Sequence, residues 1–533
     1  MRIGSAPVNW LVAVALLGAC AAGGLALYHY AGPEEVETPG PTSGGVADSR
    51  IEGQVHQFCG ACHAYPSPDT FPKRYWRKEV EQGFRFFSRS GMDLSPPKVE
   101  AVVRYYEDRA PDELPAAPSP PAPGAPKLRF EKMPGRGAPN SDTNAIANVN
   151  LVRLPRPGEA LSDETPLDVL ACDMLNGRVM RLRPSDPASG WEVLARLSNP
   201  ARTEVTDLDG DGILDILVAD LGSFPPTNDY CGKVVWLRGA KDGTYEPITL
   251  LEKVGRVSDV RVADFRGAGR KDVLVGSFGW INSGELILLE NHTEDWASPD
   301  FRPKVLDERH GVIHAPVADL NGDGRPDFVT VWAQEFESVE AFINKGDGEF
   351  ERTVLYEGPH PGYGSSGIEL ADVDADGELD VLYTNGDILD APYLFKPYHG
   401  VQWLKNLGGL EFEHSPLTPL YGAHNAASGD LNGDGRPDVV AVSFFPADKF
   451  PERAERRAES LLVLTRNESG GFARHPLTVG ECDHVSVAVG DVTGDGRPDV
   501  VVGNFDLKEG EPVTIWENLT PPVNGRVRKA AGR

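Results

Sequence analysis

The spacing of apolar residues divides the chain into two kinds of secondary structure. Residues 51–113 place apolar side chains three and four positions apart, which predicts helices. Two such stripes run through Ile51, Val55, Phe58 and Cys62, and through Val99, Val102, Val103 and Tyr106. Ser95-Pro96 is a helix-start signal for the second stripe, and Ala110-Pro111 marks its end. From about residue 127 onward the pattern changes to short alternating runs, which predict β-strands.

An acidic nine-residue segment recurs six times in the β region. The copies read DLDGDGILD, DFRGAGRKD, DLNGDGRPD, DVDADGELD, DLNGDGRPD and DVTGDGRPD, and they begin at Asp207, Asp264, Asp319, Asp372, Asp430 and Asp491. Successive copies are 57, 55, 53, 58 and 61 residues apart, which is enough for one four-stranded propeller blade each. A copy is followed by a β run such as DVVAVSF, then by a second such as LLVLTRN and an outer one such as FERTVLY.

Two further observations complete a ring of seven units. Residues 140–198 show the same rhythm without the acidic segment, as LDVLACD, GRVMRLRP and WEVLARL. The last unit ends at TIWENL without an outer strand, and residues 127–133, KLRFEKM, could supply one from the other end of the β region. Such a closure would remove the exposed edge that an open array leaves. The sequence therefore predicts a mainly β fold, a seven-bladed β-propeller over residues 127–520, preceded by a small all-α domain over residues 51–113.

The acidic segments have the composition of calcium-binding loops. Their pattern, D-x-[DN]-x-D-G-x-x-D, places oxygen ligands at positions one, three, five and nine, and calcium takes roughly six to eight such oxygens. An EF-hand is excluded, because position eight is Pro in three copies and a β run follows where a helix is required. The plainer alternative is that Asp-Gly turns merely join strands. If calcium binds, we expect its role to be structural.

This repeat resembles the FG-GAP, or VCBS-type, repeats of integrin-like propellers, over roughly residues 140–520. The resemblance implies loops at the bottom of each blade, which join the innermost strand to the next and bind about five calcium ions in all. The implied ligands are Asp207, Asp209, Asp211, Asp215, Asp319, Asn321, Asp323, Asp327, Asp372, Asp374, Asp376, Asp380, Asp430, Asn432, Asp434, Asp438, Asp491, Asp495 and Asp499. Thr493 stands at position three of the last copy and is a weaker ligand. The copy at Asp264 has Arg266 and Ala268 at ligand positions, so we expect it to bind no ion.

Residues 59–63 read CGACH, the attachment signature of a c-type haem. Two thiols three positions apart can add across both vinyl groups, and the adjacent His63 then reaches the iron. Zinc would need two further ligands, and the segment offers only His56. The region resembles a short cytochrome c of the kind fused to VCBS-repeat proteins, on QFCGACHAYPSPDTFPKRYW and SPPKVEAVVRYYEDRAPDELP. That resemblance implies one covalent haem c held by Cys59, Cys62 and His63.

The second axial ligand of this haem is open from the sequence. Met92, in SGMDLS, is the only methionine of the region and precedes its last predicted helix. A His/Met pair would raise the reduction potential. A core methionine is the competing interpretation, with His56 or a propeller residue as other ligands. At roughly 65 residues the domain is small, so the porphyrin must provide much of its core.

The N-terminal segment predicts export and attachment to a membrane. Residues 8–28 carry no formal charge and are long enough to span a bilayer. Arg2 precedes them and three glutamates follow between positions 34 and 37, which places the N-terminus inside. An uncleaved anchor within residues 1–30 is the first interpretation, and a lipoprotein signal at Leu17-Gly18-Ala19-Cys20 is the alternative. Both place the protein outside the cytoplasm, periplasmic or at the cell surface, and tether it to the membrane.

Composition adds the junctions and excludes one class of partner. Residues 31–50 have the composition of a flexible tether, residues 114–126 that of a stiff Pro/Ala linker, and residues 521–533 that of a disordered tail. The net charge of −28 argues against nucleic acid, because such a surface repels phosphate. Seventeen of the aspartates lie in the ligand loops, so calcium would offset part of this charge.

A second group of candidate residues falls at the starts of the inner strands, which must lie at the face opposite the acidic loops. Counting back from each first Asp places Arg202, Asp259, His314, Asn425 and Ser486 at one offset, with His310, His424 and His484 close by. Two long connections, residues 385–400 and 443–460, share this upper face. An uneven polar funnel is the usual place for binding or chemistry in a propeller. The alternative is solvated loop tips with unrelated histidines.

Three cysteines remain in the propeller region, an odd number for an oxidising compartment. Cys172, Cys231 and Cys482 fall on units one, two and seven, which are neighbours in a closed ring. A Cys172–Cys231 disulfide is one expectation, and a metal site that adds Cys482 and His484 is another.

These observations lead to three functional hypotheses. The first is an extracytoplasmic electron-transfer protein, whose haem relays electrons while the propeller binds a redox partner protein or a substrate. The second is a haem-coupled oxidoreductase, with Arg202, His310, His314, His424 and His484 as candidate catalytic residues at the upper mouth. The third is a propeller for adhesion or carbohydrate binding. In each, the membrane is a partner through the N-terminal anchor, and no nucleic acid is expected.

Overall fold

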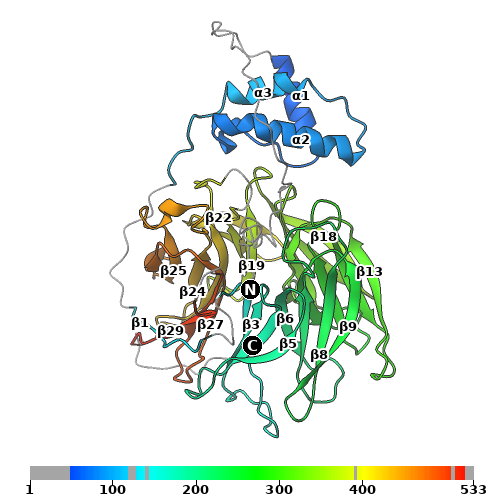
Figure 1. Cartoon of the computed structure of the whole chain (residues 1–533), viewed down its shortest axis with the longest axis vertical. Helices are drawn as coiled ribbons and strands as arrows, with labels where there is room; N and C mark the ends of the chain where they lie inside the picture. Colours follow the sequence, from blue (N-terminus) through cyan, green and yellow to red (C-terminus); the bar gives the residue numbers. More distant parts are fainter. Residues whose placement is uncertain (1–48, 118–127, 138–142, 389–392, 506–509, 522–533) are drawn as a thin grey trace, which may run out of the picture.

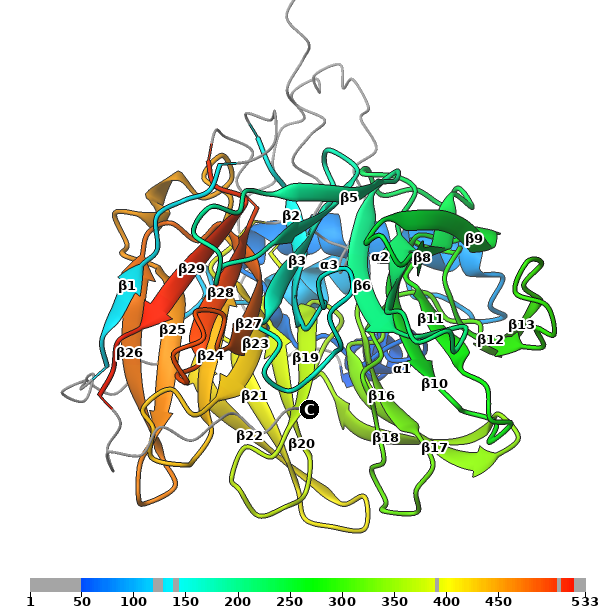
Figure 2. The same ribbon diagram turned by 90° about the horizontal axis from the view of Figure 1, so that it is seen from below.

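Seven β-sheets surround a common axis, and a group of helices rests on one end of the ring (Figure 1 and Figure 2). This computed structural model describes residues 49–117, 128–137, 143–388, 393–505 and 510–521. Below, residues 49–113 are named the helical module, and the end of the ring that carries them is the upper face. Within the described ranges, no helix is long and apolar enough to cross a membrane.

Several sequence predictions fall outside these ranges. The anchor or lipoprotein signal of residues 1–30 and almost all of the tether lie outside the described residues. The same holds for the linker from residue 118 and for the tail from residue 522. These assignments stay predictions.

The helical module contains three α-helices and two short 3₁₀ turns. They are α1 (Ser49–Cys59), η2 (Pro68–Thr70), η3 (Lys73–Tyr75), α2 (Trp76–Ser90) and α3 (Val99–Glu107). Trp76 stacks on Tyr106 with ring centroids 3.8 Å apart, and both side chains are buried together with Val55, Val102 and Val103. Stacking of two large rings supplies much of the apolar burial that so small a core needs.

Two helix boundaries differ from the sequence predictions. α1 ends at Cys59, so Cys62 and His63 lie in the turn beyond it and not on the same helical stripe. α3 begins at Val99, three residues after Pro96, because a residue before proline disfavours helical geometry and Pro96 precedes Pro97. Its end at Glu107 agrees with the predicted boundary before Ala110-Pro111.

The propeller strands follow the repeat, blade by blade (Figure 2). Blade 1 contains β2 (Ile146–Val152), β3 (Asp168–Asp173), β4 (Arg178–Leu182) and β5 (Glu192–Arg196). Blade 2 contains β6 (Pro200–Thr206), β7 (Asp215–Asp220), β8 (Gly232–Gly239) and β9 (Tyr245–Val254). Blade 3 contains β10 (Val257–Ala263), β11 (Asp272–Ser277), β12 (Glu285–Asn291) and β13 (Phe301–Asp307).

Blades 4 to 7 repeat this order. Blade 4 contains β14 (Val312–His314), β15 (Val317–Ala318), β16 (Asp327–Trp332), β17 (Ser338–Gly346) and β18 (Glu349–Glu357). Blade 5 contains β19 (Ser365–Ala371), β20 (Asp380–Asn385), β21 (Gly400–Asn406) and β22 (Phe412–Pro419). Blade 6 contains β23 (Ala423–Gly429), β24 (Asp438–Ser443), β25 (Glu459–Arg466) and β26 (Phe472–Val479), with η4 (Pro451–Arg453) between β24 and β25. Blade 7 contains β27 (His484–Gly490), β28 (Asp499–Asn504), β29 (Val513–Asn518) and β1 (Phe130–Lys132).

The ring closes as the sequence predicts. β1 pairs antiparallel with β29, with Phe130 opposite Asn518 and Lys132 opposite Trp516. The segment from the start of the propeller therefore supplies the outer strand that the last unit lacks. The seven-bladed, mainly β architecture is confirmed, and the closure protects the edge of β29.

Burial explains why the second strand of each blade reads as a continuous apolar run. Every residue of the second strands of blades 1 to 6 is buried. A strand that is covered on both faces, here by the two neighbouring blades, needs no polar face. The core of the propeller is accordingly a set of apolar clusters between blades, such as that of Val329, Val381 and Leu404.

Each inner strand carries a β-bulge at an equivalent place. The register shifts just before Arg202, Asp259, His314, Asn425 and Ser486, and equivalent shifts precede Asn148 and Gly367. A bulge re-aims the side chain that follows it. The common offset read from the sequence thus corresponds to a common structural position.

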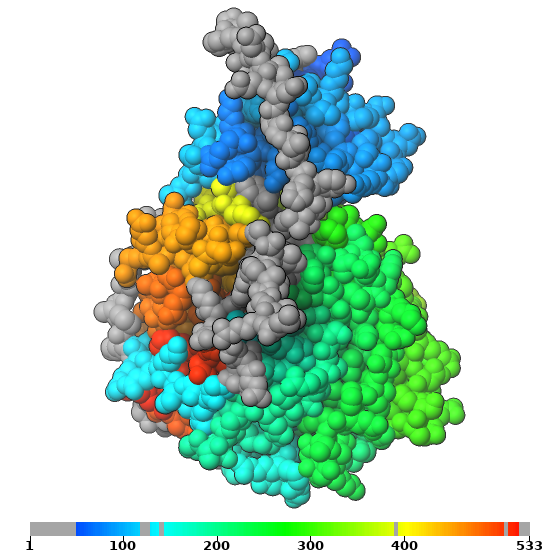
Figure 3. All heavy atoms as spheres, viewed as in Figure 1, coloured from blue at the N-terminus to red at the C-terminus, as the bar shows by residue number. Residues whose placement is uncertain are grey.

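The helical module contacts the upper face of blades 5 and 6 (Figure 3). Leu394, from the long connection between β20 and β21, packs with the module's apolar core. Phe71 lies against Gly362, where an added Cβ would come 2.9 Å from Phe71 Cζ. The backbone N–H of Ala117 donates to the hydroxyl of Tyr421 at 2.9 Å. The module is therefore docked on the propeller in this structure.

Candidate haem motif, acidic loops and upper mouth

The CGACH segment forms the turn that follows α1, at the edge of the module core. Cys59 is partly buried and Cys62 is exposed. Burial raises the pKa of the Cys59 thiol, although the nearby Tyr106 hydroxyl acts in the opposite direction. His63 Nδ1 donates to the carbonyl of Ala64 at 2.8 Å, which leaves Nε2 as the ligand atom. This donor set fits a covalent haem, with two thiols and one imidazole on a single turn.

The surroundings of the turn also fit a porphyrin. Phe58 packs against Phe84 and Phe87 with ring centroids 5.0 and 4.9 Å away, and these rings are only partly covered. Met92 is 38% exposed, and its Sδ lies 3.2 Å from Cys62 Sγ. Met92 is therefore not a core methionine, and it stands on the side of the motif that carries Cys62. Its role as the second axial ligand stays a prediction.

A pair of propeller residues faces the same motif. His310 Nε2 lies 3.0 Å from Glu335 Oε2 at the rim of blade 4. Burial alone would raise the pKa of Glu335, but the hydrogen bond with His310 and the charges of His310 and His63 lower it. Burial and Glu335 in turn raise the pKa of Cys62. The motif thus turns toward blade 4, where the sequence had indicated His310 but not Glu335.

The acidic loops join each inner strand to the next at the lower face, as the resemblance implies. In each, the first Asp organises the turn by accepting backbone N–H groups. Asp430 accepts from Asp434 at 3.0 Å and from Gly435 at 2.8 Å, and Asp319 accepts from Asp323 and Gly324 at 3.1 and 2.8 Å. Carboxylate atoms of two loops lie within 4.8 Å of one another, those of Asp207, Asp209 and Asp215 and those of Asp372, Asp374 and Asp376. Such oxygen clusters can hold a calcium ion.

Basic side chains contact some of these carboxylates. Arg238 pairs with Asp209 at 2.6 Å, and Lys405 pairs with Asp374. Both are long, partly exposed side chains, and a divalent ion would compete with them for the carboxylate. The ligand assignments of the five loops stay predictions.

The last Asp of each loop has a structural task that the sequence pattern did not reveal. Asp327 accepts from the backbone N–H of Leu320 at 2.9 Å and of Asn344 at 2.7 Å, so it joins the loop to the third strand. Asp438 does the same with Leu431 and Arg466, at 3.0 and 2.9 Å. Burial raises the pKa of Asp438 to about 7 and that of Asp215 to about 6.

Side chains from the third strands tie neighbouring loops together. Asn344 of blade 4 donates to the carbonyl of Phe265 in blade 3 at 2.9 Å, and Asn518 of blade 7 donates to Leu431 of blade 6 at 2.9 Å. Arg466 of blade 6 reaches Val373 of blade 5 at 3.2 Å. The signal available in the sequence was an Asn that recurs at the end of the third strand.

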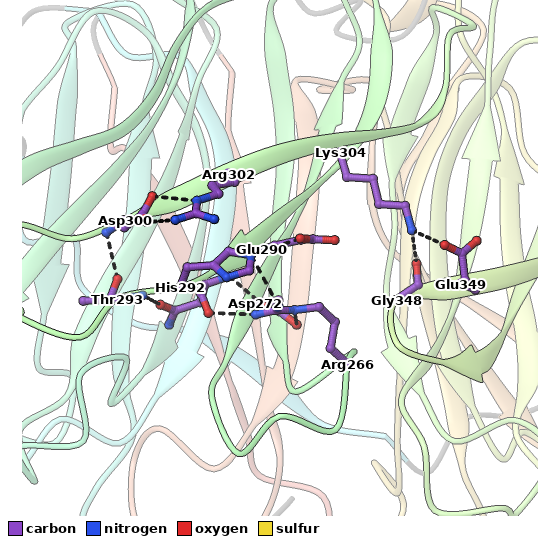
Figure 4. A network of polar contacts seen from close by, with 11 residues as sticks. Arg266, Asp272, Glu290, His292, Thr293, Asp300, Arg302, Lys304, Gly348 and Glu349 are labelled. Carbon is purple, nitrogen blue, oxygen red and sulfur yellow. Dashed lines mark hydrogen bonds and ion pairs between the residues drawn. The ribbon is translucent and has the colours of Figure 1, made fainter.

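The loop that begins at Asp264, named the divergent loop below, contains a positively charged side chain of its own, Arg266 (Figure 4). Arg266 Nε donates to both carboxylate oxygens of Asp272, at 3.0 and 3.2 Å, and Arg266 Nη2 donates to the carbonyl of Asn291 at 2.7 Å. The guanidinium thus neutralises the carboxylate at position nine. A cavity of roughly 500 Å³ separates this loop from the loop of Asp319.

At the upper mouth, the structure brings three of the aligned residues together. Arg202 Nη1 lies 3.2 Å from His314 Nδ1, and Arg202 Nε lies 3.2 Å from Asp259 Oδ1. Arg261 Nε donates to Asp259 Oδ2 at 3.1 Å and pairs with Glu204 at 3.5 Å. The cluster therefore joins blades 2, 3 and 4 across the central channel.

Burial and neighbouring charges set the ionisation of His314 and Asp259 in this cluster. Burial and the nearby Arg202 lower the pKa of His314 well below its ordinary value, so the imidazole is neutral. Burial alone would raise the pKa of Asp259, yet Arg261, Arg202 and His314 lower it, so the carboxylate is ionised. Sequence reasoning missed Glu204 and Arg261. They stand two residues after Arg202 and Asp259, and period-two alternation places them on the same strand face.

The remaining candidates do not join the cluster. His424 Nδ1 lies 3.1 Å from the carbonyl of Val485, and burial lowers its pKa to about 4. His484 is 7% exposed, and burial lowers its pKa to about 4 as well. Asn425 and Ser486 accept backbone N–H groups of Val487 and Val149, at 3.2 and 3.0 Å. His424, Asn425 and Ser486 thus join neighbouring blades.

The three propeller cysteines lie apart as free thiols. Cys172 is buried within β3, and burial raises the pKa of its thiol. Cys231 Sγ points to the carbonyl of Leu221 at 3.5 Å, and Cys482 Sγ lies 3.3 Å from Ser460 Oγ. The expected Cys172–Cys231 disulfide is not formed, because the two sulfurs face different parts of their blades.

Comparison with known proteins agrees with this architecture. Residues 207–275 and 314–383 match the FG-GAP-like repeat, and residues 485–510 match the FG-GAP repeat. The chain carries FG-GAP repeats. The matched segments include the loops that begin at Asp207, Asp264, Asp319, Asp372 and Asp491.

Two curated relatives are similar over much of the chain. Cartilage acidic protein 1 of Homo sapiens is 22% identical over 371 residues, which is 65% of this chain and 54% of that protein. The protein of the same name from Mus musculus is 21% identical over 371 residues, 65% of this chain and 55% of that protein. The chain spans about half the length of the curated relatives it matches.

Two solved structures show a more distant similarity. Virginiamycin B lyase from Staphylococcus aureus, in its selenomethionine form, is 10% identical with a TM-score of 0.43, over 73% of this chain and 99% of that chain. BBS1N in complex with ARL6DN is 10% identical with a TM-score of 0.44, over 74% of this chain and 98% of that chain.

Proposed function

We propose that this protein transfers electrons outside the cytoplasm through one covalent haem c, with the FG-GAP propeller as the platform that binds its partner or substrate. The observation that carries the proposal is the CGACH turn, whose two thiols and free His63 Nε2 stand at the edge of an aromatic core. Such a haem would supply reversible one-electron chemistry. The chain's own residues would hold it through Cys59, Cys62 and His63.

The contacts of His56 also favour haem over zinc. His56 stacks on Tyr65 with centroids 3.9 Å apart and lies 3.2 Å from the hydroxyl of Tyr105. Its ring is thus engaged with the module core and does not complete a zinc site with the two thiols.

An absorption spectrum of the protein produced with haem-attachment machinery tests this proposal. We expect a reversible c-type spectrum that survives denaturation, and its loss in the double variant Cys59→Ala, Cys62→Ala. Met92→Ala should shift the spectrum and lower the reduction potential if Met92 is the second ligand. A wild-type protein that carries no covalent haem would remove the proposal.

A second candidate is a haem-coupled oxidoreductase whose site is the cluster of Arg202, Asp259 and His314. The observation in its favour is a neutral imidazole held between an arginine and an ionised carboxylate in the central channel. Because Nδ1 accepts a hydrogen bond from Arg202, the neutral imidazole carries its proton on Nε2, and this N–H could donate a hydrogen bond to a bound substrate. Substrate-dependent haem reduction that His314→Ala abolishes, while His292→Ala leaves it intact, would favour this candidate.

A third candidate is a propeller for adhesion or carbohydrate binding, which the FG-GAP repeats fit as well as they fit a redox platform. Binding by this propeller should then persist in the Cys59→Ala, Cys62→Ala variant. Loss of all binding on removal of the haem would speak for the first proposal.

A further inference from the structure

A group of buried basic side chains lies where the helical module meets blade 5. It belongs to two loops of the upper face, residues 358–364 before β19 and residues 394–399 between β20 and β21. Their shared acceptor is the carbonyl of Gly362, which receives hydrogen bonds from Lys396 Nζ and from the hydroxyl of Tyr398, each at 3.2 Å. Phe71 of the module covers Gly362 from above.

Lys396 is fully buried, with 0% of its surface exposed. Its ammonium group makes one hydrogen bond, to Gly362, and no ion pair of Lys396 is found among the described residues. Two of its three N–H groups are therefore without an acceptor. A buried ammonium without a counter-charge is strongly unfavourable, so this position points to an anion.

Two imidazoles near this lysine each have one ring nitrogen without a hydrogen-bond partner. His399 is 1% exposed, and its Nδ1 accepts the backbone N–H of Gly422 at 3.4 Å, so the proton lies on Nε2. That Nε2–H makes no hydrogen bond. His360 is 7% exposed, and its Nδ1 is likewise without a partner. Burial first, and then the charge of Lys396, lower the pKa of both histidines, while Asp69 of the helical module acts in the opposite direction on His360. The three groups therefore share one electrostatic environment.

Two glycines bring the loop backbone close to these groups. A Cβ on Gly364, whose φ is +88°, would lie 2.9 Å from the carbonyl oxygen of Asp387 and 3.3 Å from His399 Nε2. A Cβ on Gly362 would lie 2.9 Å from Phe71 Cζ and 3.8 Å from His360 Nδ1. Both imidazoles therefore lie beside the same short glycine-containing segment whose carbonyl binds Lys396.

We propose that Lys396, His399 and His360 form a binding site for a small oxyanion at the interface of the helical module and blade 5. The ammonium of Lys396 and the Nε2–H of His399 donate to the anion, and its charge compensates that of the buried lysine. A metal cation does not suit the site, because the ammonium repels it. Carboxylates and tetrahedral oxyanions share this chemistry, and the proposal does not depend on the haem.

Anion titration of the full chain tests the site. Sulfate and acetate are the probes, at constant ionic strength with chloride as the reference, since phosphate would precipitate calcium. We expect saturable binding of at least one probe by calorimetry, together with a rise in the thermal midpoint. Stronger sulfate binding would assign a tetrahedral oxyanion, and stronger acetate binding a carboxylate.

Lys396→Met is the decisive variant, because it keeps the length of the side chain and removes the charge. We expect it to weaken binding at least tenfold, while it is no less stable than wild type in chloride alone. Lys253→Met, at a lysine that is 83% exposed, is the matched control and should bind like wild type. If Lys396→Met does not fold, His399→Leu removes one donor and should also weaken binding.

Two outcomes would overturn the proposal. One is the absence of saturable binding of either probe to the wild-type chain. The other is equal affinity in wild type, Lys396→Met and His399→Leu.

Discussion

At the scale of single residues, the fold changes the ionisation of two buried histidines of the propeller. Burial lowers the pKa of His424 and of His484 from 6.5 to about 4. The unfolded chain binds protons on these rings below about pH 6.5, whereas the folded chain excludes them down to about pH 4. The stability that depends on neutral rings is therefore complete above about pH 6.5 and is lost as the pH falls toward 4.

This linkage predicts acid sensitivity of the propeller. For each ring, the free energy of unfolding should fall by about 2 kcal/mol as the pH is lowered from about 7.5 to about 5. In His484→Gln, whose Nδ1 has no hydrogen bond to lose, this loss should shrink by about 2 kcal/mol relative to wild type. Urea denaturation at the two pH values measures it, with His292→Gln as the surface control. An unchanged loss in His484→Gln would contradict the assignment.

At the scale of elements, each acidic loop contains a tight turn, a link to the third strand of its blade and several carboxylates close together. The first Asp holds the turn and the last Asp joins it to the third strand, so both are needed even without an ion. In the divergent loop, Arg266 occupies a ligand position and pairs with Asp272. The other five loops also have a basic partner, such as Arg238 or Arg436, but each keeps at least three acidic ligand positions. An added divalent ion would offset the remaining carboxylate repulsion in these loops.

A matched pair of variants separates the ion from the turn. Asp430 and Asp264 accept the same two backbone N–H groups, at 3.0 and 2.8 Å in one loop and at 2.8 and 2.8 Å in the other. Replacement of either Asp by Ala should remove the two hydrogen bonds that hold its turn. Only Asp430→Ala should also reduce the stability that calcium adds. A single site is expected to add about 2.7 kcal/mol at a hundredfold excess over its dissociation constant.

Thermal midpoints with calcium and with a chelator measure this increment in each variant. We expect the chelator to lower the midpoint of the wild type and of Asp264→Ala by the same amount. An equal calcium increment in Asp430→Ala and in wild type would show that this loop holds no ion.

At the scale of the whole molecule, the docked position of the helical module decides where the CGACH turn faces. Leu394 of the propeller enters the apolar core of the module, and Phe71 of the module lies on Gly362. The turn is thereby directed at His310 and Glu335 on blade 4. A partner that exchanges electrons with this turn would meet the module and the rim of blade 4 together.

Weakening the contact from the propeller side should release the module. Leu394→Asp places a charge in an apolar core, and we expect a larger radius of gyration by small-angle scattering and faster proteolysis of the linker. Leu407→Asp, at a leucine of blade 5 that is 55% exposed, should leave both unchanged. Identical scattering of the two variants would mean that Leu394 does not hold the module.

The sequence by itself determined the number of blades, the closing strand and the positions of the acidic loops and of the CGACH turn. These features are local or periodic, since a turn needs its Asp and Gly side chains and a buried strand needs its apolar run, whatever surrounds them. The offset of Arg202, Asp259 and His314 was visible for the same reason.

Only the tertiary structure decided which of these side chains meet. Arg202 reaches His314 across 112 residues of sequence, while His424 contacts the neighbouring blade through the carbonyl of Val485. The same holds for His360, which belongs to a different loop from Lys396 and His399 and meets them only in the folded protein. Closure of the ring and the bulge in each inner strand determine which side chains come into contact. They fix the angle between neighbouring blades and the direction in which the inner side chains point.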